Sequence, residues 1–197
     1  PFHTWSPDGH ASAPTAVSML HAGVLMKLGG YGCFRVAMYL MPTGAAIWGD
    51  FFLVLTTISV VYGAFSAVVQ TDLKYINAYS SVSHCGLVLF ALLMMTKVSA
   101  TGAILQMLSH GLMTALFFAL IGMIYGRTHT RDIRQLSGLM KIMPFLSVGY
   151  VIAGLANLGL PGLSGFVAEM TVFVGSFQHA DSFHRICTII ATMSIVI

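Results

Sequence analysis

Long apolar runs follow one another along this chain, and they constrain its fold more than any other feature. A run of about 20 apolar residues forms a helix of about 30 Å, which matches the hydrocarbon core of a bilayer. Inside a bilayer a spanning segment must pair its own backbone polar groups, so repeated runs predict helices. The composition agrees, because 57% of the 197 residues are hydrophobic and only 8% are charged. We therefore expect an all-α, polytopic membrane helix bundle.

Polar interruptions divide the chain into about six expected spans. They follow a polar approach and cover, approximately, residues 15–41, 47–70, 75–95, 100–125, 144–178 and a last segment that begins near 184. The fifth is too long for one straight span, and GLPGLSG interrupts it at Pro161. Proline removes a backbone donor and clashes with the preceding turn, so we expect this helix to be discontinuous. Residues 1–197 are interpreted as one membrane domain, an internal fragment of a longer chain.

The most polar loop is GRTHTRDIRQLSGLMK. It holds four basic residues against one acid, namely Arg127, Arg131, Arg134 and Lys141 against Asp132. The positive-inside rule therefore predicts that the basic loop 126–143 faces the cytoplasm or the mitochondrial matrix. Counting spans alternately places residues 2–13 and 70–75 on the same side, and residues 42–46 and 96–99 on the opposite side.

Four ionisable side chains lie near the middle of expected spans: Lys27, His84, His110 and Glu169. Lys27 is roughly 18 Å from the start of its span at 1.5 Å per residue. At this depth its ammonium group could hardly extend to the membrane surface, as that of a lysine near a helix end can. A lysine or acid at mid-membrane costs about 2.5–3.5 kcal/mol on insertion scales. Because this cost recurs at one depth, and histidine titrates near neutral pH, we predict a path for protons. The simpler alternatives are a Lys–acid pair between helices and histidines that only satisfy neighbouring carbonyls.

The interruption at Pro161 lies eight residues before Glu169. Irregular backbone at membrane depth is tolerated only where it faces protein or water, and freed amides and carbonyls can hold waters that carry protons. In transporters, broken helices mark ion sites. The alternative is a packing kink, since Pro and Gly are common in membrane helices.

Other polar and sulfur-containing residues suggest no further site. The cysteines stand alone, as small packing residues do: Cys33, Cys85 and Cys187. Five histidines fall in expected loops or at span ends, where a solvated side chain is expected: His3, His10, His129, His179 and His184. The sequence contains no Gly-rich phosphate loop, nucleophile elbow or His/Cys metal spacing, so we expect no nucleotide, covalent or metal chemistry and no nucleic-acid partner.

Several long motifs occur together: HTWSPDGHASAPTAVSMLHAGVLMKLGGYG, QTDLKYINAYSSVSHCG, SHGL and GLPGLSGFVAEM. In this order they resemble the antiporter-like subunits of respiratory complex I, the proton-pumping NADH:quinone oxidoreductase. The segment RTHTRDI is similar to the M-type subunits, called chain 4 in mitochondria, rather than to the L- and N-type subunits or the Mrp antiporters. Tyr75 stands after QTDLK where the family usually has arginine, which puts a charge contact in doubt.

The resemblance implies a longer subunit with two inverted repeats, each containing a broken helix. It implies that Lys27 is the central channel lysine, that His84 and His110 link the half-channels, and that Glu169 is the acid of the second broken helix. His3 matches, more weakly, a histidine near the first break. The remaining glutamate and lysine of the family would lie upstream of Pro1.

The resulting hypothesis is a proton-translocating subunit in a bacterial plasma membrane or the mitochondrial inner membrane, without redox chemistry of its own. Its partners would be lipid and the L- and N-type subunits. NADH, quinone, FMN and iron–sulfur clusters would be bound elsewhere in the complex. Two alternatives stay open, an Mrp-type sodium/proton antiporter subunit and a structural scaffold whose charges only pair helices.

Overall fold

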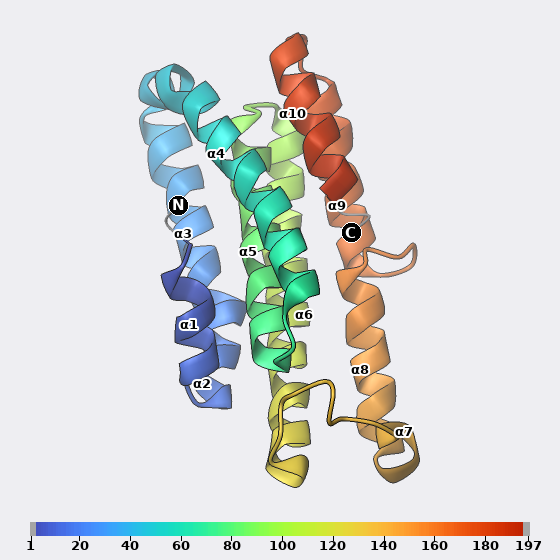
Figure 1. The fold of residues 1–197 in the computed structure, drawn as a ribbon. Coiled ribbons are helices and arrows are strands. Elements are labelled where there is room, and N and C mark those ends of the chain that lie inside the picture. Colours follow the sequence, from blue (N-terminus) through green and yellow to red (C-terminus); the bar gives the residue numbers. More distant parts are fainter. Residues whose placement is uncertain (1–2, 195–197) are drawn as a thin grey trace.

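The computed structural model describes residues 3–194, which form helices joined by short connections (Figure 1). The predicted all-α class is confirmed, since the described residues contain no strand and only one isolated bridge, between Asp72 and Asp132. In chain order the helical segments are α1 (Trp5–Ser12), α2 (Thr15–Leu20), η1 (His21–Leu25), α3 (Met26–Gly32), η2 (Cys33–Leu40), α4 (Pro42–Val69), α5 (Leu73–Leu93), α6 (Lys97–Thr128), α7 (Leu139–Ile142), α8 (Pro144–Asn157), α9 (Ser164–Phe177) and α10 (Ser182–Met193).

The observed helices agree with the expected spans, with small differences at their ends. Helices α4, α5 and α6 are each long and apolar enough to cross a membrane. Helix α4 begins five residues earlier than expected, at Pro42, because proline fits the first helical turn, where its missing donor is not needed. The first span is one helical rod in which η1 and η2 have π-helical turns. Such turns are rare and often occur at functional sites.

The connections alternate between the two ends of the bundle as the sequence predicts. Those near residues 13–14, 70–72 and 129–138 lie at one end, the lower one in Figure 1. At this end Leu73 donates from its amide to the carbonyl of Arg131 at 3.0 Å. The α3–α4 and α5–α6 connections and the start of α10 lie at the other end (Figure 1).

The expectation of a solvated side chain is wrong for His10. Helix α1 packs along α5, and His10 is fully buried, with its ring centroid 5.3 Å from that of Phe118 and its Nε2 3.4 Å from the sulfur of Met26. The end of this segment also has a partner on α5. Lys74 donates to the carbonyl of Ala13 at 2.6 Å, which pairs a group that the end of α1 leaves free.

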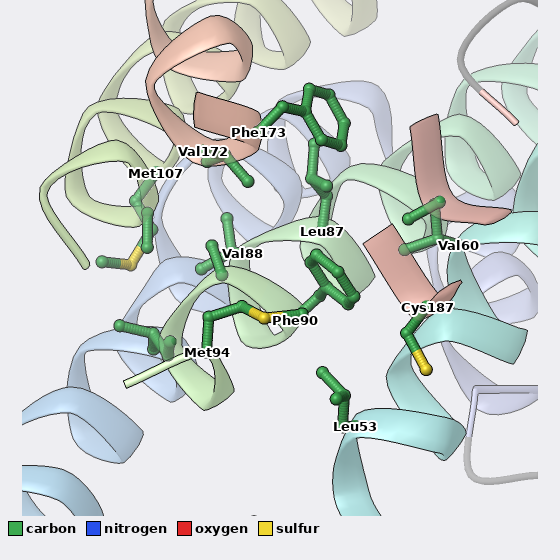
Figure 2. Close-up of a cluster of buried hydrophobic side chains, with 14 residues drawn as sticks. Leu53, Val60, Leu87, Val88, Phe90, Met94, Met107, Val172, Phe173 and Cys187 are labelled. Carbon is green, nitrogen blue, oxygen red and sulfur yellow. The ribbon is translucent and has the colours of Figure 1, made fainter. Parts of the chain in front are cut away.

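The α4–α5–α6–α9–α10 region encloses the larger apolar core. Figure 2 shows its side chains converging from these helices, and Phe90 is completely buried among them. Lipid tails are as apolar as leucine, so close van der Waals packing must hold such helices together. Small residues provide it. A Cβ atom at Gly102 would lie 2.6 Å from the amide nitrogen of Val172, so α6 and α9 approach as closely as glycine allows.

The fifth expected span is broken, as predicted around Pro161. Helix α8 ends at Asn157 and α9 begins at Ser164. The connection contains Gly159 and Gly162 with φ angles of +61° and +101°, a region that favours glycine. The break therefore leaves six residues, 158–163, outside helical geometry.

Candidate functional site

Lys27 begins a row of polar side chains that crosses the bundle. It lies just after the π-helical segment η1, and its ammonium group donates to the carbonyl of Ala22 in that segment. Its Cε lies 3.8 Å from the position of a Cβ at Gly111 on α6. The same Cβ would lie 2.7 Å from the carbonyl oxygen of Gly23, so a side chain at this position would push α6 away. Two glycines thus bring the lysine against α6.

His110 and His84 continue the row from α6 to α5. Their ring centroids are 4.9 Å apart, and His110 precedes Gly111, which Lys27 approaches. His110 is 1% exposed, and among residues 3–194 neither of its ring nitrogens has a hydrogen-bond partner. Buried polar groups are nearly always paired, and exceptions call for an explanation such as catalysis or bound water.

Glu169 on α9 ends the row at the helix break. Its Oε1 lies 3.7 Å from Nδ1 of His84, and the residue is 6% exposed. The carboxylate also packs against the Cα of Gly159, where a Cβ would collide with Oε2 and lie 3.2 Å from Cδ. The glycine of the break therefore makes room for the acid. A carboxylate at this depth would be costly unless partners or water stabilise it.

Further polar side chains, which were not predicted from the sequence, surround the row. Gln106 donates from Nε2 to Nδ1 of His84 at 3.2 Å, and Ser109 and Ser164 are hydrogen-bonded at 2.8 Å. Asn157 donates to Ser80 at 3.2 Å. Gln106 could have been found from its position, since it precedes His110 by four residues and so shares one face of a helix. Asn157 and Ser164 flank the break.

A cavity of about 230 Å³ adjoins His84 and the end of α8. Four of its polar lining residues are Ser80, Ser83, His84 and Asn157. The volume holds several water molecules, since one water needs roughly 30 Å³ of liquid volume. Polar groups that are too far apart for a direct hydrogen bond are commonly joined through water. The arrangement can therefore support proton transfer between groups that do not touch directly.

The structure brings four of the five candidate site residues together and leaves one apart. Lys27, His110, His84 and Glu169 follow one another across α3, α6, α5 and α9, as their common depth predicts. His3 lies instead against α4, with its ring centroid 4.7 Å from that of Tyr62. His3 lines a separate cavity of about 470 Å³, which is also lined by Cys85, the residue after His84 on α5.

The end of the bundle that carries the basic loop is held by polar contacts between distant segments. Asp72 accepts a hydrogen bond from the amide of Lys74 at 2.7 Å and lies 3.4 Å from Nε of Arg131. Tyr75 donates to Oδ1 of Asp8 at 3.0 Å. The tyrosine thus contacts an acid through its uncharged hydroxyl at the position where the resemblance implies an arginine.

Comparisons with known proteins identify relatives along the whole chain. It is 43% identical over 200 residues to NAD(P)H-quinone oxidoreductase chain 4 3 of Picosynechococcus sp., covering 100% of this chain and 36% of that protein. It is 39% identical over 196 residues to NADH-quinone oxidoreductase subunit M of Rickettsia conorii, covering 100% of this chain and 39% of that protein. The chain thus spans well under half the length of these relatives.

A solved structure shows the same fold. A chain of respiratory complex I from Thermus thermophilus with bound NADH superposes with a TM-score of 0.92 at 32% identity, over 100% of this chain and 41% of that chain. The sequence model of the transmembrane family NADH:quinone oxidoreductase/Mrp antiporter matches residues 1–196. By sequence and by fold, this chain belongs to the NADH:quinone oxidoreductase/Mrp antiporter transmembrane family.

Proposed function

We propose that this chain is part of an M-type, proton-translocating membrane subunit of NADH:quinone oxidoreductase. The observation that carries the proposal is the row Lys27–His110–His84–Glu169, which crosses from the first helical rod to the broken helix. His110 and Glu169 are buried, and the other two members are half-buried. Ionisable side chains at membrane depth are functional groups by default, and proton relays in pumps use chains of acids and histidines. The assignment to this enzyme complex is inferred from the names of the relatives, which are quinone oxidoreductase subunits.

In the proposed mechanism Lys27 stores a proton in the middle of the membrane. His110 and His84 pass protons between the lysine and Glu169, whose Oε1 lies 3.7 Å from His84. Water bridges the groups that are too far apart for a direct hydrogen bond. Glu169 releases the proton on the exit side, next to the irregular backbone of the break. Quinone reduction elsewhere in the complex would change the charge at a neighbouring subunit and so expel the proton by repulsion.

The proposal also covers the surroundings of this chain. Its neighbours would be lipid and the L- and N-type subunits, in a bacterial plasma membrane or the mitochondrial inner membrane. The basic loop 126–143 would face the cytoplasm or matrix, in accord with the positive-inside rule. The chain itself would take part in no redox step, and FMN, iron–sulfur clusters and quinone would be bound by other subunits. Residues 1–197 would belong to one membrane domain, and His3 would have an accessory role.

Alanine substitutions in the intact complex test this proposal. We expect Lys27→Ala and Glu169→Ala to impair proton pumping into proteoliposomes while the complex still assembles. Lys97→Ala is the matched control, because Lys97 is exposed at the end of the bundle opposite the basic loop. Wild-type pumping in both Lys27→Ala and Glu169→Ala would refute the proposal.

The family also includes Mrp antiporters, so sodium/proton exchange is the second candidate function. The same carboxylate beside a broken helix could exchange the two ions. Sodium-dependent proton movement in vesicles that contain only the full-length protein would favour it. A purely structural scaffold predicts a third result, namely that Lys27→Met and Glu169→Met both leave pumping intact.

A further inference from the structure

A cluster of histidines and acids lies at the end of the bundle opposite the basic loop, outside the polar row. His179 and Asp181 belong to the connection between α9 and α10, and His184 lies in the first turn of α10. Asp50, two turns into α4, faces the same place. From the sequence, solvated histidines and no metal ligands are expected here. The expectation of a solvated side chain is wrong for His184, which is 8% exposed because α10 packs its first turn against α4.

Three of these residues place possible metal-ligand atoms close together. His179, Asp181 and His184 each offer one ligand atom, and the three atoms lie within 4.8 Å of one another. The two histidine rings are stacked, with centroids 3.8 Å apart and an interplanar angle of 18°. Ligands of a tetrahedral zinc ion are separated by roughly 3.4 Å at bond lengths of about 2.0–2.1 Å, so the two rings would have to rotate out of their stacked arrangement for both nitrogens to point at one ion.

The hydrogen bonds indicate which nitrogens are free to bind. Nε2 of His184 lies 3.5 Å from Oδ1 of Asp50, which favours the proton on Nε2 and leaves the lone pair on Nδ1. That Nδ1 is buried, lies 3.7 Å from Oδ2 of Asp181, and has no hydrogen-bond partner among residues 3–194. On His179 the Nδ1 accepts a long hydrogen bond from the amide of Asp181 at 3.3 Å, so its lone pair is engaged, and a metal ion bound there would replace this hydrogen bond.

The contact between Asp50 and His184 has the form found around metal ions in proteins. A metal-bound histidine usually donates its second ring N–H to a carboxylate, which fixes the tautomer and orients the ring. The charges also favour a cation. The carboxylates of Asp50 and Asp181 both lie beside His184, and the guanidinium of Arg185 is engaged with the carbonyl of His179 through Nε at 3.0 Å.

We propose that His179, Asp181 and His184 bind a divalent zinc ion, with Asp50 as the residue that positions His184. Imidazole and carboxylate ligands suit zinc, and three protein ligands leave its fourth position open to water. The ion would fasten the α9–α10 connection and the start of α10. Through Asp50 it would also link them to α4. The carboxylates of Asp50 and Asp181 are 70% and 71% exposed, which gives the ion a route of entry from the aqueous side.

Zinc binding to the intact, detergent-solubilised complex tests the proposal. Wild type and variants are titrated with ZnCl₂ and freed of unbound metal, and zinc per complex is counted by atomic absorption. We expect Asp181→Asn and His184→Gln each to bind one zinc ion fewer than wild type. Asp50→Asn should keep the site but weaken it about 10- to 100-fold, the usual effect of losing such a carboxylate. His129→Gln, an exposed histidine at the other end of the bundle, is the matched control and should bind as wild type does.

Equal zinc stoichiometry in wild type and Asp181→Asn would overturn the proposal. This variant is informative because the exposed Asp181 carboxylate can be replaced without disturbing the core. Thermal unfolding of the wild-type complex with and without ZnCl₂ is the second measurement. A rise in the unfolding temperature that Asp181→Asn abolishes supports the site, and a rise that persists in Asp181→Asn contradicts it.

Discussion

Replacing Gly159 by alanine should disable the polar row without removing any of its ionisable groups. Gly159 has a φ of +61°, and a Cβ there would collide with Oε2 of Glu169. An alanine in left-handed geometry costs roughly 1–2 kcal/mol. The carboxylate must also retreat by about 1 Å or more to reach an ordinary contact of roughly 3.5 Å. A displacement of about 1 Å at a reacting group can lower a rate about 100-fold. We therefore expect proton pumping to fall by about 10- to 100-fold.

Gly162→Ala separates the position of the carboxylate from backbone strain. Gly162 belongs to the same break and has a φ of +101°, but nothing lies within 4 Å of a Cβ built there. Both variants strain the backbone, whereas only Gly159→Ala moves Glu169. Pumping per NADH oxidised, measured in proteoliposomes with equal amounts of assembled complex, should fall for Gly159→Ala and change little for Gly162→Ala. An equal loss in the two variants would refute the reasoning, because strain alone would then explain it.

Three further substitutions test the packing and the surroundings of the row. Lys74→Met leaves a backbone carbonyl at the end of α1 without its charged donor, and should lower the free energy of unfolding by about 1.5–3 kcal/mol in denaturation of the full chain. Gly175→Ala places a methyl group against the backbone of Ser99, and should lower the free energy of unfolding by about 1–3 kcal/mol and reduce the yield of assembled complex. Gly126→Ala is the control, because its methyl group would meet nothing within 4 Å, and it should have neither effect. Gln106→Leu removes the amide that donates to His84 of α5, so pumping should fall while assembly persists. Unchanged pumping would show that this amide takes no part in proton transfer.

Much of the architecture follows from the sequence because membrane helices obey simple rules. The lengths of the apolar runs predict the helices, and the proline and glycines around Pro161 predict the break. The grouping of Lys27, His84, His110 and Glu169 follows from depth alone, since groups at one level on packed helices have few places to lie. Their common depth made the row predictable even though it joins four separate helices.

Other features depend on contacts between distant segments, which no local pattern reveals. The sequence around His10 predicts a solvated polar segment, yet the segment forms a helix packed on the bundle. Its backbone carbonyls accept hydrogen bonds from Lys74 on α5 and from Arg131 in the basic loop. His3 matches a family position but lies against α4, away from the row. The convergence of His184 with Asp50 joins residues 134 positions apart in the sequence, and the pairing arises only from the packing of α10 on α4.

The proton-to-electron ratio of Glu169→Gln tests the central claim most directly. Glutamine keeps the shape and hydrogen-bonding capacity of the side chain but cannot release a proton, so only the titrating step is lost. The account predicts that the intact complex carrying this variant assembles and oxidises NADH, yet translocates fewer protons per electron than wild type. A wild-type ratio in this variant would contradict the account.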